Sequence, residues 1–173
     1  MGTLKQIMDE QIINWNANII PGHSIGRLKF MKFTLIEFNK NKLFYENNFV
    51  IKESSDNKGT YIDIYNKAPV FKQNANLIMV LHFNNENLLV GSRIFSNENF
   101  FYRGKIYNKY GLGDKLINLT NFGSLIIDYT GEEFHLIENK KCGIMLYCGM
   151  GSSLEEEPNQ KIRSIYVFPC YEF

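Results

Sequence analysis

Short segments in which apolar and polar residues alternate dominate the hydrophobic pattern of this 173-residue chain. A period of two is typical of strands that bury one face and expose the other. In the first half, the pattern predicts strands at 49–53, 60–65 and 76–83, and a hairpin made of 88–95 and 100–107. In the second half, it predicts strands at 124–129, 132–137, 143–148 and 162–168.

Helical patterns are fewer. Residues 3–15 place apolar side chains at helical spacing behind Thr3, which can cap the first turn. Residues 113–123 predict a short helix with Asp114 as its N-cap. The segment 27–45 leaves a strand and a helix both open. The chain has 3 Ala against 21 Asn and 20 Ile, a composition that favours strands over helices.

The second half of the chain echoes the first at a spacing of 84 to 87 residues. Three marker residues recur: Gly26, Gly59 and Phe83 correspond to Gly113, Gly143 and Phe168. Two pairs of segments match in residue type: 48–54 with 133–139, and 77–83 with 162–168. A repeat on this scale predicts two copies of one supersecondary unit that share a core. Gly59 and Gly143 each follow a polar turn, so a positive φ is expected at both.

These patterns together predict a strand-rich α+β fold. We expect two tandem units, each a helix followed by an antiparallel meander, because a helical layer on one face of an antiparallel sheet buries both. The expected organisation is an N-terminal helix over 1–20, a first unit over 21–104 and a second over 105–173, all in one compact globule.

The second unit carries a recognisable order of motifs: G-x-G-D-x-L-x-x-L-x-x-x-G at 111–123, D-Y-x-x-E-E-F at 128–134, G-I-x-L-Y at 143–147 and I-x-S-I-x-V at 162–167. This order resembles the helix-then-meander module of β-lactamase-inhibitory protein, of small outer-membrane assembly lipoproteins and of bacterial immunity-type proteins. Residues 105–173 carry most of the likeness, and 21–83 repeat it in degraded form. The resemblance implies a fold and, as an expectation, an inhibitor. No functional residue is carried over by it.

Composition excludes several classes of protein. The net charge of +1 argues against general nucleic-acid binding. No apolar run approaches the ~20 residues that a membrane span needs. Asp9 and Glu10 stand where a signal peptide would need an apolar stretch. We therefore expect a cytoplasmic protein that binds neither nucleic acid nor membrane, and the sequence leaves its oligomeric state open.

No catalytic or metal-binding motif stands out. The three cysteines, Cys142, Cys148 and Cys170, predict buried free thiols and no disulfide framework. The three histidines have no metal-ligand spacing, Gly111-Leu112-Gly113 lacks the third glycine of a nucleotide loop, and Ser152 and Ser153 have no G-x-S-x-G context. Residues 22–26, Gly-His-Ser-Ile-Gly, match this spacing, but the nucleophile motif needs a strand before it and a helix after it, and no strand is predicted before Gly22. The sequence therefore predicts a non-enzymatic protein without metal or cofactor.

The segment 99–110 is rich in aromatic and basic residues. One interpretation is a surface on which bases or a partner stack. The other is a strand in which Phe100, Tyr102 and Ile106 fill the core while Arg103 and its neighbours face solvent.

The acidic residues are the sharpest functional candidates. Three lie consecutively in the polar loop 149–160 and two at a separate turn: Glu155, Glu156 and Glu157, then Glu132 and Glu133. Such clusters often only solvate a loop. The alternative is an acidic surface that binds a basic protein partner, because complementary charge raises the association rate.

The first functional hypothesis is therefore a cytosolic immunity protein that neutralises a cognate bacterial toxin, for which a basic nuclease is one candidate. The alternative is a carrier of small apolar ligands in an aromatic-lined, lipocalin-like β-barrel. An enzyme whose site is assembled in space ranks third. A carrier needs an interior cavity of about 300 Å³ or more, whereas an inhibitor needs a filled core.

Overall fold

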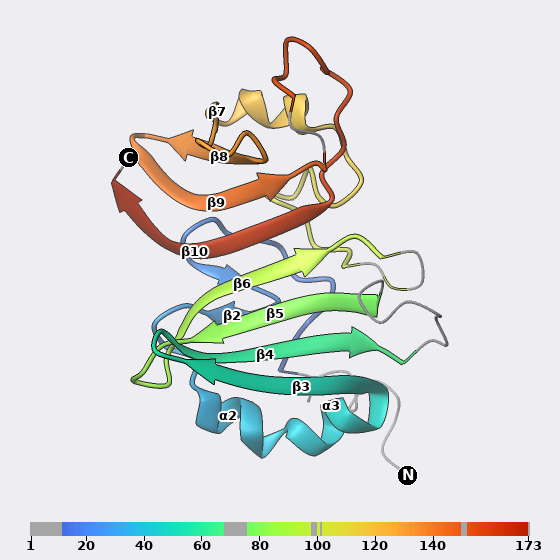
Figure 1. Ribbon diagram of the computed structural model, residues 1–173, viewed down its shortest axis with the longest axis vertical. Helices are drawn as coiled ribbons and strands as arrows, with labels where there is room; N and C mark the ends of the chain where they lie inside the picture. Colours follow the sequence, from blue (N-terminus) through green and yellow to red (C-terminus); the bar gives the residue numbers. More distant parts are fainter. Residues whose placement is uncertain (1–11, 68–75, 98–99, 101, 150–151, 173) are drawn as a thin grey trace.

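The computed structural model describes residues 12–67, 76–97, 100, 102–149 and 152–172 (Figure 1). Its main feature is an eight-stranded sheet in the order β3-β4-β5-β6-β10-β9-β8-β7, accompanied by a two-stranded sheet, β1-β2. The bounds of the elements are β1 Ser24–Ile25, β2 Leu28–Lys29, α2 Leu35–Lys40, α3 Lys42–Asn48, β3 Phe49–Asp56, β4 Gly59–Asn66, β5 Leu77–Phe83, β6 Leu89–Phe95, η2 Leu116–Asn121, β7 Ser124–Ile127, β8 Glu133–Glu138, β9 Lys141–Tyr147 and β10 Ser164–Glu172.

The large sheet is antiparallel throughout its named pairs and consists of two meanders. Strands β3 to β6 are neighbours in chain order, and so are β7 to β10, but the second set is reversed so that β6 pairs with β10. In Figure 1, α2 and α3 lie beside β3, while η2 lies near β7 at the opposite end. The expected strand-rich α+β class is thereby confirmed. The expected internal repeat is not shown by this arrangement.

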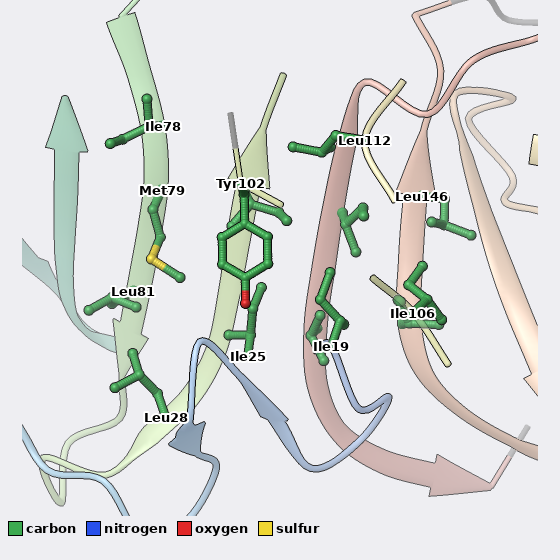
Figure 2. Close-up of a cluster of buried hydrophobic side chains, with 14 of the residues drawn as sticks. Ile19, Ile25, Leu28, Ile78, Met79, Leu81, Tyr102, Ile106, Leu112 and Leu146 are labelled. Atoms are coloured by element: carbon green, nitrogen blue, oxygen red, sulfur yellow. The ribbon is translucent and has the colours of Figure 1, made fainter. Parts of the chain in front are cut away.

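One face of the sheet is buried. Its central row runs across six strands through Ile64, Met79, Ile94, Ile165, Leu146 and Phe134, and all of them are buried. Residues of the N-terminal segment and of the loop after β6 pack on this face, as Figure 2 shows for Ile19, Ile25, Tyr102 and Ile106. The core therefore consists of this face of the sheet and the irregular segments that cover it.

The ambiguous segment 27–45 resolves into strand followed by helix. Strand β2 occupies only two residues, and α2 begins after Thr34, whose hydroxyl accepts a hydrogen bond from the backbone N–H of Glu37. The Glu37 carboxylate in turn accepts from the Thr34 N–H, which completes a capping box. Phe38 of α2 and Tyr45 of α3 stack in the core with ring centroids 5.5 Å apart.

The predicted strands at 49–53, 60–65, 76–83 and 88–95, and the four of the second half, are confirmed within a few residues. The predicted strand at 100–107 is wrong. β5 and β10 occupy both sides of β6, so no edge is left for that hairpin. The segment packs on the N-terminal chain instead, where Arg103 N–H donates to the Trp15 carbonyl. The interpretation that alternate side chains of this segment fill the core holds for Tyr102 and Ile106, which are buried, while Arg103 is exposed.

Three local expectations need correction or fall outside the structure. The helix predicted over 3–15 lies mostly outside the described residues, and 12–15 form bends and a turn. Asp114 does not cap η2, because its Oδ2 accepts from Lys105 Nζ and from the Gly111 N–H, each at 2.8 Å. Gly59 has the expected positive φ of 139°, but Gly143 does not. A Cβ at Gly143 would instead collide with the backbone of Gly22.

Candidate functional site

The face of the sheet opposite the core carries a continuous row of side chains. The cross-strand register aligns one residue from every strand between the two edges: Lys52, Asp63, Val80, Arg93, Tyr166, Met145, His135 and Ile126. Because side chains of directly paired residues point to the same face, these eight project together. We call this surface the open face.

Burial distinguishes the two faces. In the central row of the core face every residue from β4 to β8 is buried, whereas in the row of the open face none is. Lys52 and Ile126, at the two edges, are exposed, and the six residues between them are half-buried. No described segment therefore covers this face as the N-terminal chain covers the other.

Aromatic rings concentrate on the open face. Tyr61 and His82 are direct cross-strand partners, and their rings stack with centroids 4.4 Å apart. On β10, Tyr166 and Phe168 are 5.2 Å apart, and Phe168 stacks on Tyr171 at 5.6 Å. Burial raises the pKa of the Tyr166 phenol above its ordinary value. Paired rings of this kind hold one another in fixed orientations, so the surface they present is preorganised.

Arg93 lies at the centre of the open face. Its Nη1 is 2.6 Å from Oε1 of Glu133, and its guanidinium lies 5.1 Å from the centroid of the Tyr166 ring. Strands β10 and β9 separate β6 from β8, so in a flat sheet these two strands would be ~14 Å apart. An ion pair across that interval requires the sheet to curl toward the open face. The pair is only partly exposed, at 28% for Arg93 and 16% for Glu133.

Two clefts open beside Arg93. A cleft of about 380 Å³ lies toward β8 and includes Glu132, Glu133, Tyr147 and Arg163 in its lining. A smaller pocket of about 210 Å³ lies toward β4, between the Tyr61–His82 pair and Tyr166. Arg93 lines both. The open face is therefore indented on both sides of Arg93.

The acidic residues predicted from the sequence lie near the end of the sheet at which β10 begins. Glu132 and Glu133 stand where β8 begins, whereas Glu155, Glu156 and Glu157 belong to the loop between β9 and β10, which is hydrogen-bonded to residues 113–116. Glu132 is exposed, but Glu133 is already paired with Arg93. Glu155 and Glu156 are exposed, and Glu157 is half-buried in a third cleft of about 340 Å³. That cleft and the 380 Å³ cleft share Ser96 and Arg163, so the two acidic groups border adjoining clefts.

Part of this acidic cluster has a local structural role. The Glu156 carboxylate accepts hydrogen bonds from the N–H and the hydroxyl of Ser153, at 3.1 and 3.2 Å. The Glu156 N–H donates back to the Ser153 hydroxyl, so this pair caps a turn of the loop. Glu155 and Glu132 are also exposed, and their carboxylates take no part in this cap.

The aromatic residues and Arg93 were not among the sequence-predicted site residues. A signal for the aromatic residues exists in strands 60–65, 76–83 and 162–168, where several positions beside the buried residues carry an aromatic or apolar side chain in place of the Lys and Glu common on solvated faces: Tyr61, Val80, His82 and Tyr166. Their alignment into one row depends on strand pairing, which the sequence alone does not supply.

The three cysteines differ in burial. Cys142 and Cys148 are buried and free, as expected, but Cys170 is exposed. Burial raises the pKa of the Cys148 thiol to about 11, so it is protonated at neutral pH. Among the described residues, no group of three His, Cys, Asp or Glu side chains is placed to hold a metal ion.

Comparison of the chain with protein-family models, with curated proteins and with solved structures finds no match. Within the described part of the chain, no helix has the length and apolar character to cross a membrane.

Proposed function

We propose that this chain is a non-enzymatic inhibitor that binds a partner protein on the open face of its sheet. The observation that carries the proposal is the row of side chains that crosses the sheet, whose half-buried members include Arg93, Tyr166 and His135, together with the stacked Tyr61–His82 pair beside it. Tyr and Arg are enriched among the residues that dominate binding energy in protein interfaces, whereas Lys and Glu are depleted there. The expected setting is a cytosolic immunity protein and its cognate toxin.

The dimensions favour a protein over a small ligand. Eight strands at ~4.8 Å measure roughly 34 Å across a flat sheet, which suits an interface of ~800 Å² per partner. β3 and β7 stand at the two ends of the strand order and do not pair with each other. A closed, ligand-holding barrel, the alternative hypothesis, therefore has less support than a docking surface.

The acidic residues supply the proposed electrostatic component. Glu132 is exposed beside the 380 Å³ cleft of the open face, and Glu155, Glu156 and Glu157 lie in the loop between β9 and β10, so all four are near the end of the sheet at which β10 begins. In this proposal a basic partner, such as a nuclease, is steered toward that end before the aromatic surface engages. The acidic residues then govern mainly the association rate, and the open face governs the lifetime of the complex.

We further propose that the two halves are copies of one helix-plus-meander unit. The reversed strand order supports this, because each half is a helical element followed by four consecutive strands and the halves meet at β6 and β10. In this arrangement β3, β4, β5 and β6 correspond to β7, β8, β9 and β10, in that order. The glycine spacing instead matches Gly59 of β4 with Gly143 of β9, which is a shift of one strand.

The test is a titration against the product of the neighbouring gene, because an immunity gene accompanies its toxin. Met145→Asp places a charge in the middle of the open face, and we expect a loss of affinity of at least 100-fold. Leu43→Asp is the matched control, since Leu43 lies on α3 and is 71% exposed. Circular dichroism verifies that both variants fold. Equal binding by Met145→Asp and the wild-type chain would refute the open face as the docking surface.

A further inference from the structure

The 210 Å³ pocket of the open face has an unusual floor. It lies over Gly91 of β6, with Tyr61 and His82 on one side and Tyr166 on the other. A Cβ at Gly91 would collide with the Tyr166 hydroxyl and would lie 2.9 Å from its ring, so the Tyr166 ring covers this glycine. Because Gly91 has no side chain, the Tyr166 ring can lie against the backbone of β6 and line the pocket.

One wall of this pocket contains an unsatisfied polar atom. Nε2 of His82 is buried and has no hydrogen-bond partner among the described residues. Buried polar atoms are nearly always paired in folded proteins, so an unpaired one at a cavity indicates a place for an incoming group. Ser92 Oγ is also unpaired, but the register pairs Ser92 with Leu81 and Val167 on the core face.

The remaining polar groups of the pocket can all donate hydrogen bonds. Arg93 offers guanidinium N–H groups beyond the one directed at Glu133, and Tyr61 and Tyr166 offer hydroxyls. His82 donates through Nε2 in the corresponding tautomer. The nearby carboxylate of Asp63 is not part of the lining, and it accepts from the Tyr65 hydroxyl at 3.2 Å. Arg93 is thus the one formally charged residue in the described lining.

We infer that this pocket binds a carboxylate side chain, an Asp or Glu of the docked protein, which accepts from His82 Nε2–H and from Arg93. A carboxylate accepts and does not donate, so it complements a set of donors, and an incoming cation would be repelled by Arg93. The volume is below the ~300 Å³ of typical small-molecule sites and suits a single side chain. This inference rests on the proposed function, since it names the chemistry by which the open face holds its partner.

The experiment uses a library of random 12-residue peptides displayed on phage and selected on the folded chain. Selected peptides are synthesised, and their affinities for the wild-type chain are measured. We expect them to share an Asp or Glu at a fixed position and to lose binding to Met145→Asp. His82→Phe keeps a ring stacked on Tyr61 but removes the nitrogen, so we expect affinity to fall at least tenfold.

A second change tests the same contact without altering the protein. Replacing the shared acid of the peptide by Asn or Gln should weaken binding to the wild-type chain at least tenfold. It should weaken binding to His82→Phe by a clearly smaller factor, because only the contact with Arg93 is then left to lose. Peptides that lose binding to Met145→Asp but lack a shared acid, or that ignore both changes at the pocket, overturn this inference and leave the docking surface intact. Peptides that bind Met145→Asp normally, or no enrichment at all, overturn the docking surface as well.

Discussion

The hydroxyl of Tyr102 joins the N-terminal segment to the rest of the protein, and its removal in Tyr102→Phe should destabilise the fold. Tyr102 is 2% exposed and lies at the centre of the cluster in Figure 2. Its oxygen accepts from the Gly26 N–H at 2.8 Å and donates to the Ala17 carbonyl at 2.7 Å. The phenylalanine ring fills the same space, so the change isolates these two hydrogen bonds.

The magnitude follows from what each partner loses. The Gly26 N–H is buried, and a buried donor without a partner costs about 1–3 kcal/mol. The Ala17 carbonyl is half-buried and retains some access to water, so its loss costs about 1 kcal/mol. We therefore expect the free energy of unfolding to fall by about 2–4 kcal/mol. With a urea m-value of about 2 kcal/mol/M, the midpoint falls by about 1–2 M.

Equilibrium unfolding in urea, followed by circular dichroism, measures this shift. Tyr129→Phe is the matched control, because Tyr129 is 101% exposed and its hydroxyl lies in solvent. We expect its midpoint to equal that of the wild-type chain. A midpoint shift in Tyr102→Phe of less than about 0.3 M, at an unchanged m-value, would show that the two backbone groups find other partners and would refute the reasoning.

Three further predictions follow from local features. Gly59→Val should destabilise the protein by about 1–3 kcal/mol in thermal melts, since Gly59 has a φ of 139° and its Cβ would collide with a β5 carbonyl; an unchanged melting temperature would contradict this. Cys170 should react with an aromatic disulfide reagent in the folded protein, whereas the buried Cys142 and Cys148 should react only after unfolding; three rapid thiols would be inconsistent with their burial. Burial raises the pKa of Tyr45 to about 12, above the ordinary value of 10 that it has in the unfolded chain. The contribution of the protonated phenol to the free energy of unfolding is therefore intact below pH 10 and is lost between pH 10 and 12, at up to ~1.4 kcal/mol per pH unit. Tyr45→Phe should flatten this decline in urea midpoints measured from pH 9 to 11.5, and an equally steep decline would exclude Tyr45 as its source.

The strands were predictable because their signal is local. An alternation such as that of Thr60 to Tyr65 records which residues face the core, whatever the neighbouring strand is. The wrong strand at 100–107 shows the limit of this signal. Tyr102 and Ile106 alternate with Arg103 as a strand would, but they pack on the N-terminal chain, and the alternation alone cannot identify the surface that buries them.

The open face was not predictable for a related reason. Arg93 and Glu133 are 40 positions apart in the sequence and are brought together by the pairing of β6 with β10 and the curl of the sheet. Asp114 is a similar case, since a residue suited to cap a helix instead binds Lys105 from outside the helix. The acidic loop, by contrast, was visible in the sequence because consecutive glutamates need no tertiary contact to be recognised.

The junction between β6 and β10 also constrains the order in which the protein can fold. Strand β6 ends at Phe95, and its partner β10 begins only at Ser164, after β7, β8 and β9. During synthesis, the first meander can form while the edge of β6 remains unpaired, because the strand that covers it is made only after β7, β8 and β9. An unpaired edge is a template for association with other chains. A chain that stops before β10 would therefore leave the edge of β6 unpaired and prone to associate with other chains.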